Sequence, residues 1–394
     1  MKHILAIALL MYFVSTLSYS KNKAVYTDIS SIIEKKTKAP EFSIKDVKIT
    51  CINEQGDIAG TFTGNQTPTL KTIFVLHCSK NGSYTQFFNI GVFKDAIVTG
   101  INEERTITIN IKTDSTNAFT PYFVKYKGNN YEKLEKSRRY QLSKISDYQT
   151  DGFVYGIKGS YVYGTMRFEI QETTLATVST DLDPKIEDAS MTQEKCHIGF
   201  IKNVETGLVQ YTGFAVNQDN DIKSMSSNGA YCGSSKGFPE GQFLGQACPY
   251  FAEKNIRYQL LAGLEGTSTA MNNNGQVVGV WYRENNRQKQ GFVWNKADMN
   301  NSHDGWRNIY TGLSVYPKSI NDEGIVVGMI DANKAFAWKD GHLVFLENIR
   351  DEKNKILVDQ ILDIEAINNK NFIVCTGKIN KEKRALIWKY EKIR

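Results

Sequence analysis

The sequence predicts an all-β protein, a β-propeller built from four-stranded antiparallel blades. Two observations carry this prediction. A unit of turn, strand, turn and aromatic strand recurs along the chain, and its copies are separated by 34 to 49 residues, which is the spacing that a four-stranded blade needs. Aromatic residues make up 11% of the chain, and the many Gly-containing turns leave little room for amphipathic helical periodicity.

The clearest copy of the unit lies between residues 319 and 338. The segment 321–324 (NDEG) predicts a tight turn, because Asn offers a side-chain acceptor to nearby backbone N–H groups and Gly adopts positive φ. The β-branched run 325–330 predicts a buried strand. The segments 335–338 (AFAW) and 342–346 (HLVFL) predict the next two strands. With a short lead-in strand before the turn, the unit forms a four-stranded meander.

Eight copies of this unit can be aligned on the position of Asn321. Four copies are strong and four are weaker, and they begin at Asn53, Asn102, Gln149, Thr192, Ser226, Asn272, Asn321 and Asn368. Eight copies predict eight blades. Seven blades is the alternative, because the copies at Gln149 and Ser226 are weak, and an open β-solenoid of the same modules is the main structural rival.

The two ends of the chain predict how the ring closes. The last unit stops soon after Trp388 and shows no fourth strand, whereas the segment 24–29 (AVYTDI) resembles the fourth strand of other units. If this N-terminal strand pairs with the last blade, both terminal strands gain ladder partners and no raw sheet edge remains there. We therefore expect the N-terminal strand to close the ring.

Residues 1–20 have the pattern of a signal peptide, with Lys2 and His3 before an apolar core that is too short to span a bilayer. Residues 21–394 contain no linker and are predicted to form one propeller domain, exported through the inner membrane and then periplasmic or secreted. No later segment has the length and apolarity of a transmembrane helix. The net charge of +6 is mild and scattered, which disfavours a nucleic-acid partner, and we expect a monomer.

The repeating unit resembles the bacterial extracellular HAF-type repeat family. The residues that carry the resemblance are Ser319, Ile320, Asn321, Gly324, Val326, Val327, Gly328, Ala335, Phe336, Trp338 and Gly341, and the segment 272–279 is the next best copy. Lys334 stands where the HAF triplet has His. The resemblance implies an exported, propeller-like protein of Gram-negative bacteria and implies no established reaction.

Six cysteines in an exported chain raise the question of disulfides. Cys232 and Cys248 are expected in the second and third strands of one unit, so a cross-strand bridge is predicted between them. Cys51 and Cys78 are expected in the first and third strands of one blade, too far apart for a bridge. Cys196 and Cys375 are predicted to be buried thiols in second strands of distant blades.

No catalytic constellation, metal site or cofactor site emerges from the sequence. The five His are isolated, no Gly-x-Ser-x-Gly elbow occurs, and no Cys/His spacing suggests zinc. Trp294, Trp338 and Trp388 share one repeat position, which predicts packing between blades. The predicted binding residues are Tyr282 and Arg283, in a loop between second and third strands, and Trp281 and Trp306, which fall outside the repeated Trp position.

Two classes of function follow from these observations. The preferred hypothesis is a non-enzymatic binding module that presents its loop-rich face to a protein or glycan partner, with host interaction as a variant. The alternative is a carbohydrate-active or other hydrolase with carboxylates at the channel mouth. Converging carboxyl groups at the mouth would favour the enzyme, and a mouth lined by Asn, Ser and apolar groups would favour binding.

Overall fold

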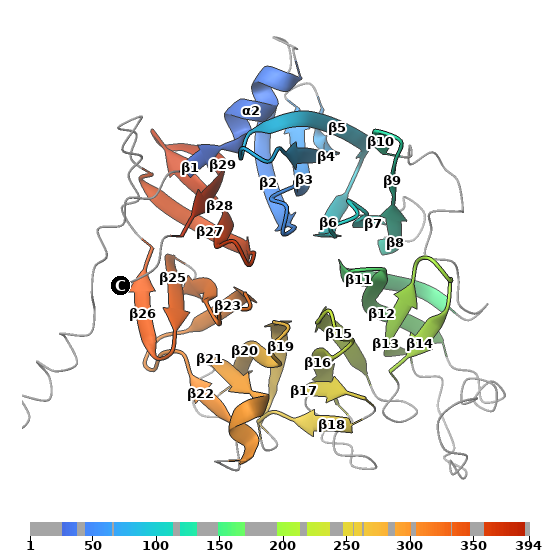
Figure 1. Ribbon diagram of the computed structural model, residues 1–394, viewed down its shortest axis with the longest axis vertical. Helices are drawn as coiled ribbons and strands as arrows, with labels where there is room; N and C mark the ends of the chain where they lie inside the picture. The colour runs from blue at the N-terminus through green and yellow to red at the C-terminus, as the bar shows by residue number, and fades with distance from the viewer. Residues whose placement is uncertain are drawn as a thin grey trace, which may run out of the picture.

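Seven blades surround a central axis in the computed structural model (Figure 1). The structure describes residues 26–37, 44–64, 67–112, 119–131, 149–169, 195–212, 219–236, 247–254, 256–261, 264–282, 288–300, 305–331, 333–346 and 358–390. Within each blade the first strand lies innermost, and the first strands of neighbouring blades contact one another around the axis. The predicted all-β propeller of four-stranded antiparallel blades is confirmed.

The blades are numbered here from the first complete meander. Blade 1 contains β2 (Ile44–Ile52), β3 (Ile58–Gly64), β4 (Thr67–Cys78) and β5 (Tyr84–Phe93). Blade 2 contains β6 (Ala96–Ile101), β7 (Ile107–Lys112) and β8 (Phe119–Val124), and the small hairpin β9 (Tyr126–Lys127) and β10 (Asn130–Tyr131) follows it. Blade 3 contains β11 (Gln149–Lys158), β12 (Tyr161–Glu169), β13 (Lys195–Asn203) and β14 (Val209–Tyr211).

The remaining blades follow the same order. Blade 4 contains β15 (Asn220–Met225), β16 (Tyr231–Ser235), β17 (Cys248–Glu253) and β18 (Ile256–Gln259). Blade 5 contains β19 (Gly266–Met271), β20 (Gln276–Tyr282), β21 (Lys289–Asn295), the 3-10 helix η1 (Lys296–Asn300) and β22 (Trp306–Asn308). Blade 6 contains β23 (Val315–Ile320), β24 (Val326–Ile330), β25 (Lys334–Lys339) and β26 (His342–Phe345).

Blade 7 contains β27 (Gln360–Ile367), β28 (Phe372–Ile379) and β29 (Glu382–Lys389), and its fourth strand is β1 (Tyr26–Asp28) from the other end of the chain. β1 runs antiparallel to β29, with Thr27 opposite Ile387. The predicted pairing of the N-terminal strand with the last blade is confirmed. The helix α2 (Ile29–Lys36) continues from β1, and the Asp28 side chain caps it by accepting from the Ser31 backbone N–H at 3.1 Å.

The prediction of eight blades is wrong. The copies at Gln149 and Thr192 belong to one blade, because Gln149 begins β11 and the segment after Thr192 forms β13, the third strand of the same sheet. A strand with a closing Gly matches the repeat whether it is the first, second or third of its blade. The long connection between β12 and β13 made one blade resemble two in the sequence.

Every innermost strand contains a β-bulge shortly before its turn. The residue that the register skips is Thr50, Thr99, Tyr155, Lys223, Thr269, Lys318 or Glu365 in blades 1 to 7 respectively. A bulge adds one residue to one strand of a pair and increases the local twist. The seven bulges therefore give the innermost strands a shared local geometry.

The core lies between blades and consists of the predicted β-branched and aromatic runs. Trp294, Trp338 and Trp388 on the third strands are 1%, 6% and 2% exposed, which confirms that this repeat position packs in the interior. Each belongs to a separate apolar cluster. Burial of three indole rings at one repeat position stabilises successive blade contacts in the same way.

The predicted disulfide between Cys232 and Cys248 is absent from the structure. Cys232 lies opposite Phe251 and Cys248 lies opposite Ser235, so the two residues are three positions out of register. Cys51 and Cys78 lie in first and third strands as predicted, and Cys375 is buried in a second strand. Cys196 lies in β13, a third strand and not a second strand as predicted.

Candidate functional site

The candidate site lies on the face of the ring that bears the turns between first and second strands. We call these turns the inner turns, and they are residues 53–56, 102–105, 158–161, 226–229, 272–275, 321–324 and 368–371. Because the blades are antiparallel meanders, the connections between third and fourth strands lie on the same face, which we call the turn face. The connections between second and third strands lie on the opposite face, the loop face.

The Asn that begins an inner turn closes that turn with its side-chain oxygen. Oδ1 of Asn53 accepts from the backbone N–H groups of Gln55 at 3.0 Å and Asp57 at 2.8 Å. Asn272 binds its own turn in the same way, at 3.1 Å and 3.0 Å. The predicted role of Asn as an acceptor for nearby backbone groups is confirmed.

The same Asn side chain also binds the next blade, which the sequence analysis did not predict. Nδ2 of Asn53 donates to the Asn102 carbonyl at 2.9 Å, and Nδ2 of Asn272 donates to the Asn321 carbonyl at 2.9 Å. Asn368 donates to the Asn53 carbonyl at 2.9 Å, which joins the last blade to the first. Each Asn thus fixes its own turn and holds the following blade against it.

Two blades have another residue at this position, and there the contact changes. Gly159 in blade 3 has no side chain to donate, although its carbonyl accepts from Asn102 at 2.8 Å. Ser226 in blade 4 is too short to reach the next blade, and its neighbour takes over: the Ser227 backbone N–H donates to Oδ1 of Asn273 at 2.7 Å. The turns therefore remain linked where the Asn is missing.

The kind of contact that Ser227 makes with Asn273 is repeated between each of the following blades, and we call this series of contacts the relay. The Asn273 N–H donates to Asp322 at 2.8 Å, the Asp322 N–H to Asn369 at 2.7 Å, and the Asn369 N–H to Glu54 at 2.9 Å. Each side chain accepts from the backbone of the blade before it. The relay therefore places the Glu54 and Asp322 carboxylates firmly at the inner end of the turn face.

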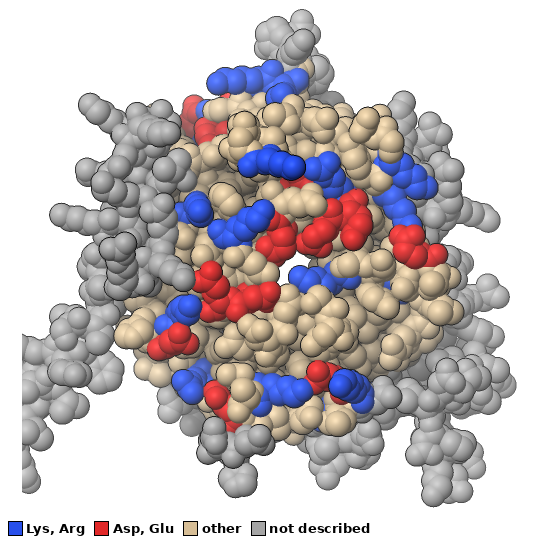
Figure 2. Space-filling model, viewed as in Figure 1, with Lys and Arg blue, Asp and Glu red and all other residues tan. Residues whose placement is uncertain are grey.

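Acidic side chains gather beside the narrow central opening of this face (Figure 2). Glu54, Glu103 and Asp322 hold the second position of three inner turns, and their charges influence one another. Burial raises the pKa of Glu54, the negative charges of Glu103 and Asp322 raise it further, and the Asn369 N–H and Lys158 oppose this increase. The mouth of the channel is therefore an acidic surface on a chain whose net charge is positive.

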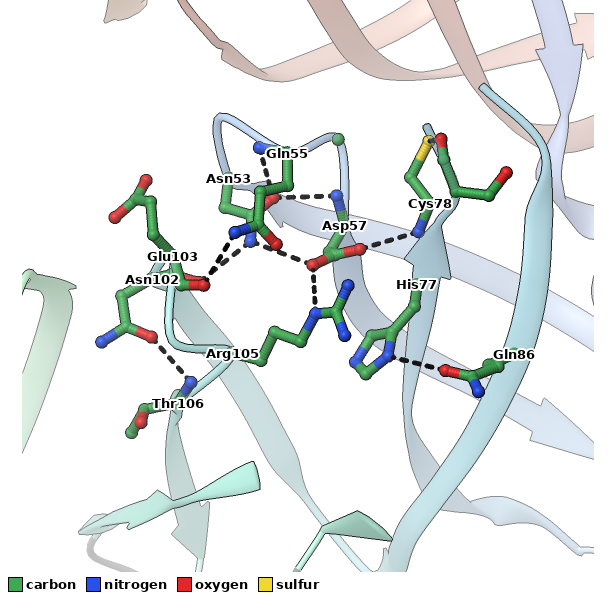
Figure 3. Close-up of polar contacts among 12 residues, drawn as sticks. Asn53, Gln55, Asp57, His77, Cys78, Gln86, Asn102, Glu103, Arg105 and Thr106 are labelled. Atoms are coloured by element: carbon green, nitrogen blue, oxygen red, sulfur yellow. Dashed lines mark hydrogen bonds and ion pairs between the residues drawn. The ribbon is translucent and has the colours of Figure 1, made fainter. Parts of the chain in front are cut away.

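Directly below this mouth, a buried ion pair joins blades 1 and 2 (Figure 3). Nε of Arg105 lies 2.9 Å from Oδ2 of Asp57, whose side chain is fully buried. Asp57 also accepts from Nδ2 of Asn53 at 3.2 Å and from the Cys78 backbone N–H at 2.7 Å. Three donors therefore satisfy the carboxylate, which is the condition under which a buried charge is tolerated.

Arg105 occupies the turn position that Gly56, Gly275 and Gly324 hold in other blades, and its φ is +63°. This backbone conformation costs about 1 kcal/mol or more for a residue with a side chain. The contacts of Arg105 with Asp57 and with the Tyr126 ring, whose centroid lies 5.5 Å from Cζ, compensate for it. An Arg where the repeat has Gly is the sequence signal that could have revealed this cluster.

His77 completes the cluster in an aromatic enclosure. Its ring lies 4.6 Å from Phe88 and 4.8 Å from Tyr126 between centroids. Nδ1 lies 3.2 Å from Oε1 of Gln86, and Nε2 lies 3.2 Å from the Tyr131 hydroxyl. The side chain is 2% exposed, and burial lowers the pKa of His77 despite the opposing charge of Asp57. Both ring nitrogens are engaged within the protein.

These contacts decide what the cluster can do chemically. A general base must reach a substrate proton, and a nucleophilic thiol needs a lowered pKa. His77 is enclosed and both of its nitrogens have partners, whereas burial raises the pKa of the Cys78 thiol. The cluster fits a role in holding blades 1 and 2 together beneath the mouth better than a role in catalysis.

The predicted binding residues lie in blade 5, away from the mouth. Trp281 and Trp306 come together with ring centroids 5.8 Å apart in an edge-to-face arrangement, and the Trp281 indole N–H donates to Oδ1 of Asn308 at 3.0 Å. Tyr282 ends β20 and lies 5.6 Å from the Lys289 ammonium. Arg283 lies outside the described residues. The two indoles are half-buried and pack on each other.

The innermost strands carry further charges in pairs. Nζ of Lys48 lies 2.8 Å from Glu365, and Nζ of Lys318 lies 3.6 Å from Asp363. Burial raises the pKa of Glu365, and the Lys48 ammonium opposes this increase. Each of these carboxylates lies within ion-pair distance of a lysine.

The described residues contain neither a cluster suited to a metal ion nor a helix suited to crossing a membrane. No group of three or more His, Cys, Asp or Glu side chains in these ranges has a geometry that could hold a metal ion. No helix in the same part of the chain has the length and apolar character needed to cross a membrane.

Comparison with sequence families gives one partial match. Residues 265–342 match the model of a family described as a protein of unknown function (DUF3466). This segment begins within blade 5 and ends in blade 6, where the repeat is most regular. A search of curated protein sequences found no significant match.

Comparison with solved structures finds propellers of low sequence identity. A Pyrococcus horikoshii acylaminoacyl peptidase aligns with a TM-score of 0.50 and 9% identity, over 87% of this chain and 52% of the peptidase. The β-propeller domain of the Trilobed protease from Pyrococcus furiosus aligns with a TM-score of 0.49 and 9% identity, over 88% and 97%. YCF48 bound to D1 peptide aligns with a TM-score of 0.47 and 8% identity, over 95% and 99%.

The present chain spans about half the length of the first of these structures. At such low identity the alignment with that peptidase bears on the fold alone. It agrees with the propeller architecture, and what the mouth of the channel does must be argued from its own residues.

Proposed function

We propose that this chain is a non-enzymatic binding propeller that holds a protein partner on its turn face. One observation carries the proposal: acidic side chains gather beside the channel mouth, the backbone relay fixes two of them, Glu54 and Asp322, and the reactive groups beneath them are engaged with one another. Such a fixed surface of net negative charge favours recognition, because its groups need little reordering when a partner arrives.

This proposal keeps the class of partner expected from the sequence and changes the contact face. The loop face was preferred at first because of its long connections, and the segments 237–246 and 283–287 of that face lie outside the described residues. The turn face carries the ordered polar groups. A glycan partner is an alternative outcome of the test below.

Capture from envelope extract tests the proposal. Residues 21–394 are immobilised as the wild-type chain and as the E103Q/E104Q variant, in which neither substitution removes a side chain of the relay. We expect a partner that the wild type retains and the variant releases, because rim charges contribute to association. The matched control is Glu382→Gln, which neutralises an exposed carboxylate on the loop face. Equal retention by all three proteins would contradict the proposed face.

A hydrolase remains the second candidate, because one observation favours it. Glu54 has a raised pKa and lies near Glu103 and Asp322, and glycosidases use a pair of carboxyl groups of which the general acid has a raised pKa. Release of reducing ends from a panel of polysaccharides, lost in Glu54→Gln, would establish the enzyme. Glu54→Gln keeps an oxygen acceptor for the Asn369 N–H, so the relay is preserved.

We further propose export, with residues 1–20 as the cleaved signal peptide, and membership of the HAF-type repeat family. The apolar run before Ser18 and the match of the 319–341 unit to the repeat support these two proposals. N-terminal sequencing of the protein recovered from a periplasmic extract tests the first. Recovery of the protein only from the cytoplasm, with Met1 intact, would contradict it.

A further inference from the structure

Exposed apolar side chains are concentrated on the turn face. Among the described residues, five large apolar side chains are strongly exposed, and four of them belong to turns or connections of this face: Tyr161, Leu208, Ile256 and Met299. The fifth, Val92, lies one residue before the end of β5, towards the loop face. Single exposed apolar residues are normal on a protein surface, but these four occur in the consecutive blades 3, 4 and 5.

The most exposed of them lie on outer turns of neighbouring blades. Leu208, between β13 and β14, is 73% exposed, and Ile256, at the start of β18, is 56% exposed. Tyr161 follows the inner turn of blade 3 and is 43% exposed. Blades 3 and 4 are in direct contact through β12 and β15, so the three side chains belong to neighbouring blades, and we call this part of the turn face the apolar sector.

This apolar sector adjoins the acidic sector. Nδ2 of Asn102 donates to the Gly159 carbonyl at 2.8 Å, which holds the turn bearing Glu103 and Glu104 against the turn that leads to Tyr161. In Figure 2 the acidic residues lie above and to the left of the opening, a basic side chain borders it on the right, and the surface below it is largely uncharged up to the outer turns. The two kinds of surface therefore meet at the boundary between blades 2 and 3.

The charges of the inner turns limit which kind of molecule can bind to the turn face. The seven inner turns contain five acidic residues (Glu54, Glu103, Glu104, Asp322 and Glu323) and three basic residues (Arg105, Lys158 and Lys370), a local net charge of −2 on a chain of net charge +6. Arg105 is engaged by Asp57. A second copy of this positive chain or an acidic segment would be disfavoured at the mouth, whereas a basic segment would be attracted.

We infer that the turn face binds a protein segment carrying both basic and apolar side chains, the basic groups over the acidic inner turns and the apolar groups over Tyr161, Leu208 and Ile256. This inference rests on the proposed function and specifies its partner. The apolar side chains leave water at the outer turns while the ammonium or guanidinium groups meet the carboxylates at the mouth.

Fluorescence anisotropy with three labelled peptides tests the inference. The first peptide contains only Lys and Leu, the second replaces every Lys with Glu, and the third replaces every Leu with Ser. We expect the wild-type chain to bind the first peptide and to bind the other two at least about tenfold more weakly. Neutralising the partly exposed Glu103 and the exposed Glu104 in E103Q/E104Q should weaken binding about three- to tenfold, and L208S/I256S should weaken it about five- to thirtyfold.

Matched control variants on the loop face separate effects of the turn face from effects of losing any surface charge or apolar group. Glu382→Gln and Val92→Ser remove an exposed charge and an exposed apolar group from the loop face, and each should change the affinity less than about twofold. Since none of the substituted side chains is buried, the variants should fold, which their circular dichroism spectra verify. Equal binding of the Leu-free peptide, or equal weakening by the loop-face controls, would overturn the inference.

Failure of this inference can be distinguished from failure of the proposed function. If the Lys–Leu peptide does not bind but the envelope partner is retained in a Glu103- and Glu104-dependent manner, the turn face binds a partner of another class and this inference fails alone. If neither the peptide nor a partner depends on the turn face, both proposals fail.

Discussion

At the scale of single residues, one side chain performs two tasks in this molecule. Asn at the start of an inner turn accepts from its own turn and donates to the next blade. The first task could be predicted, because Asn commonly binds nearby backbone N–H groups. The second could not, because its acceptor lies 49 residues further along the chain and a single sequence contains no measure of that contact.

The first prediction concerns this Asn. Asn272→Ala should lower the free energy of unfolding by about 2–3 kcal/mol, because the part-buried Gln276 N–H loses its partner and the Asn321 carbonyl loses one of its two donors. Urea denaturation measures the change. Asn274→Ala in the same turn is the control, since its exposed side chain makes one contact with the Asp322 carbonyl, and it should cost less than about 1 kcal/mol. Equal losses would contradict the dual role.

Arg105 illustrates a residue that breaks the repeat for a structural reason. Arg105→Met should destabilise the protein by about 2–4 kcal/mol, because it leaves the Asp57 charge buried without its partner. The double variant D57N/R105M should recover part of this loss, since no charge then remains buried. A double-mutant cycle from urea denaturation gives the coupling energy, and a value near zero would show that the pair contributes nothing.

His77 makes stability depend on pH. Its pKa in the folded protein is lowered by burial, so the unfolded state binds the proton more readily, starting near its ordinary pKa of about 6.5. The contribution of His77 is therefore complete above that value and is lost as the pH falls. Between pH 7 and 5 the wild type should lose more stability than His77→Gln, whose slope of unfolding free energy against pH should be shallower. Parallel slopes would exclude His77 as the cause.

At the scale of elements, the four-stranded meander could be predicted from the sequence, whereas the number of blades could not. The run of β-branched residues after Gly324 and the aromatic strand ending in Trp338 identified second and third strands correctly. The error arose in blade 3, where a long connection separates β12 from β13. Strand pattern has a period of two residues and is the same in every strand, so it cannot reveal which place in the sheet a strand occupies.

The N-terminal element allows a direct test. A chain that begins at residue 38 lacks β1 and α2, which exposes the edge of β29 and removes the contact of the Ser30 hydroxyl with the Ala385 N–H at 2.9 Å. We expect a melting temperature lower by about 5 °C and self-association through the free edge. Adding a peptide of residues 21–37 should reverse both effects.

Asp28→Ala is the control for this truncation. It removes only the helix cap, which costs about 1 kcal/mol, and the protein should remain monomeric in size-exclusion chromatography. A truncated chain that stays monomeric with an unchanged melting temperature would show that β1 contributes nothing to the last blade.

At the scale of the whole molecule, segments from the two ends of the sequence meet in two ways. β1 completes blade 7 by pairing with β29, and blade 7 is joined to blade 1 by the Asn368 contact with the Asn53 carbonyl and the Asn369 contact with Glu54. The number of blades could not be predicted from the repeat copies, because it depends on how the seven sheets pack around the axis. The repeat established the kind of fold, and the packing determined the count.

These contacts predict coupling between distant parts of the chain. Asn368→Ala combined with the truncation at residue 38 should be non-additive by about 1 kcal/mol, because both changes act on the same boundary between blades 7 and 1. Asn272→Ala combined with the same truncation should be additive, since it acts between blades 5 and 6. Additivity of both pairs in urea denaturation would contradict this account of the boundary.

The pairing of Thr27 with Ile387 also fixes the order of events during biosynthesis. The residues that leave the ribosome early have no sheet to join until the final hairpin of the chain has been made. The last sheet therefore cannot be completed before β29 has been made, and until then it carries one unfinished edge.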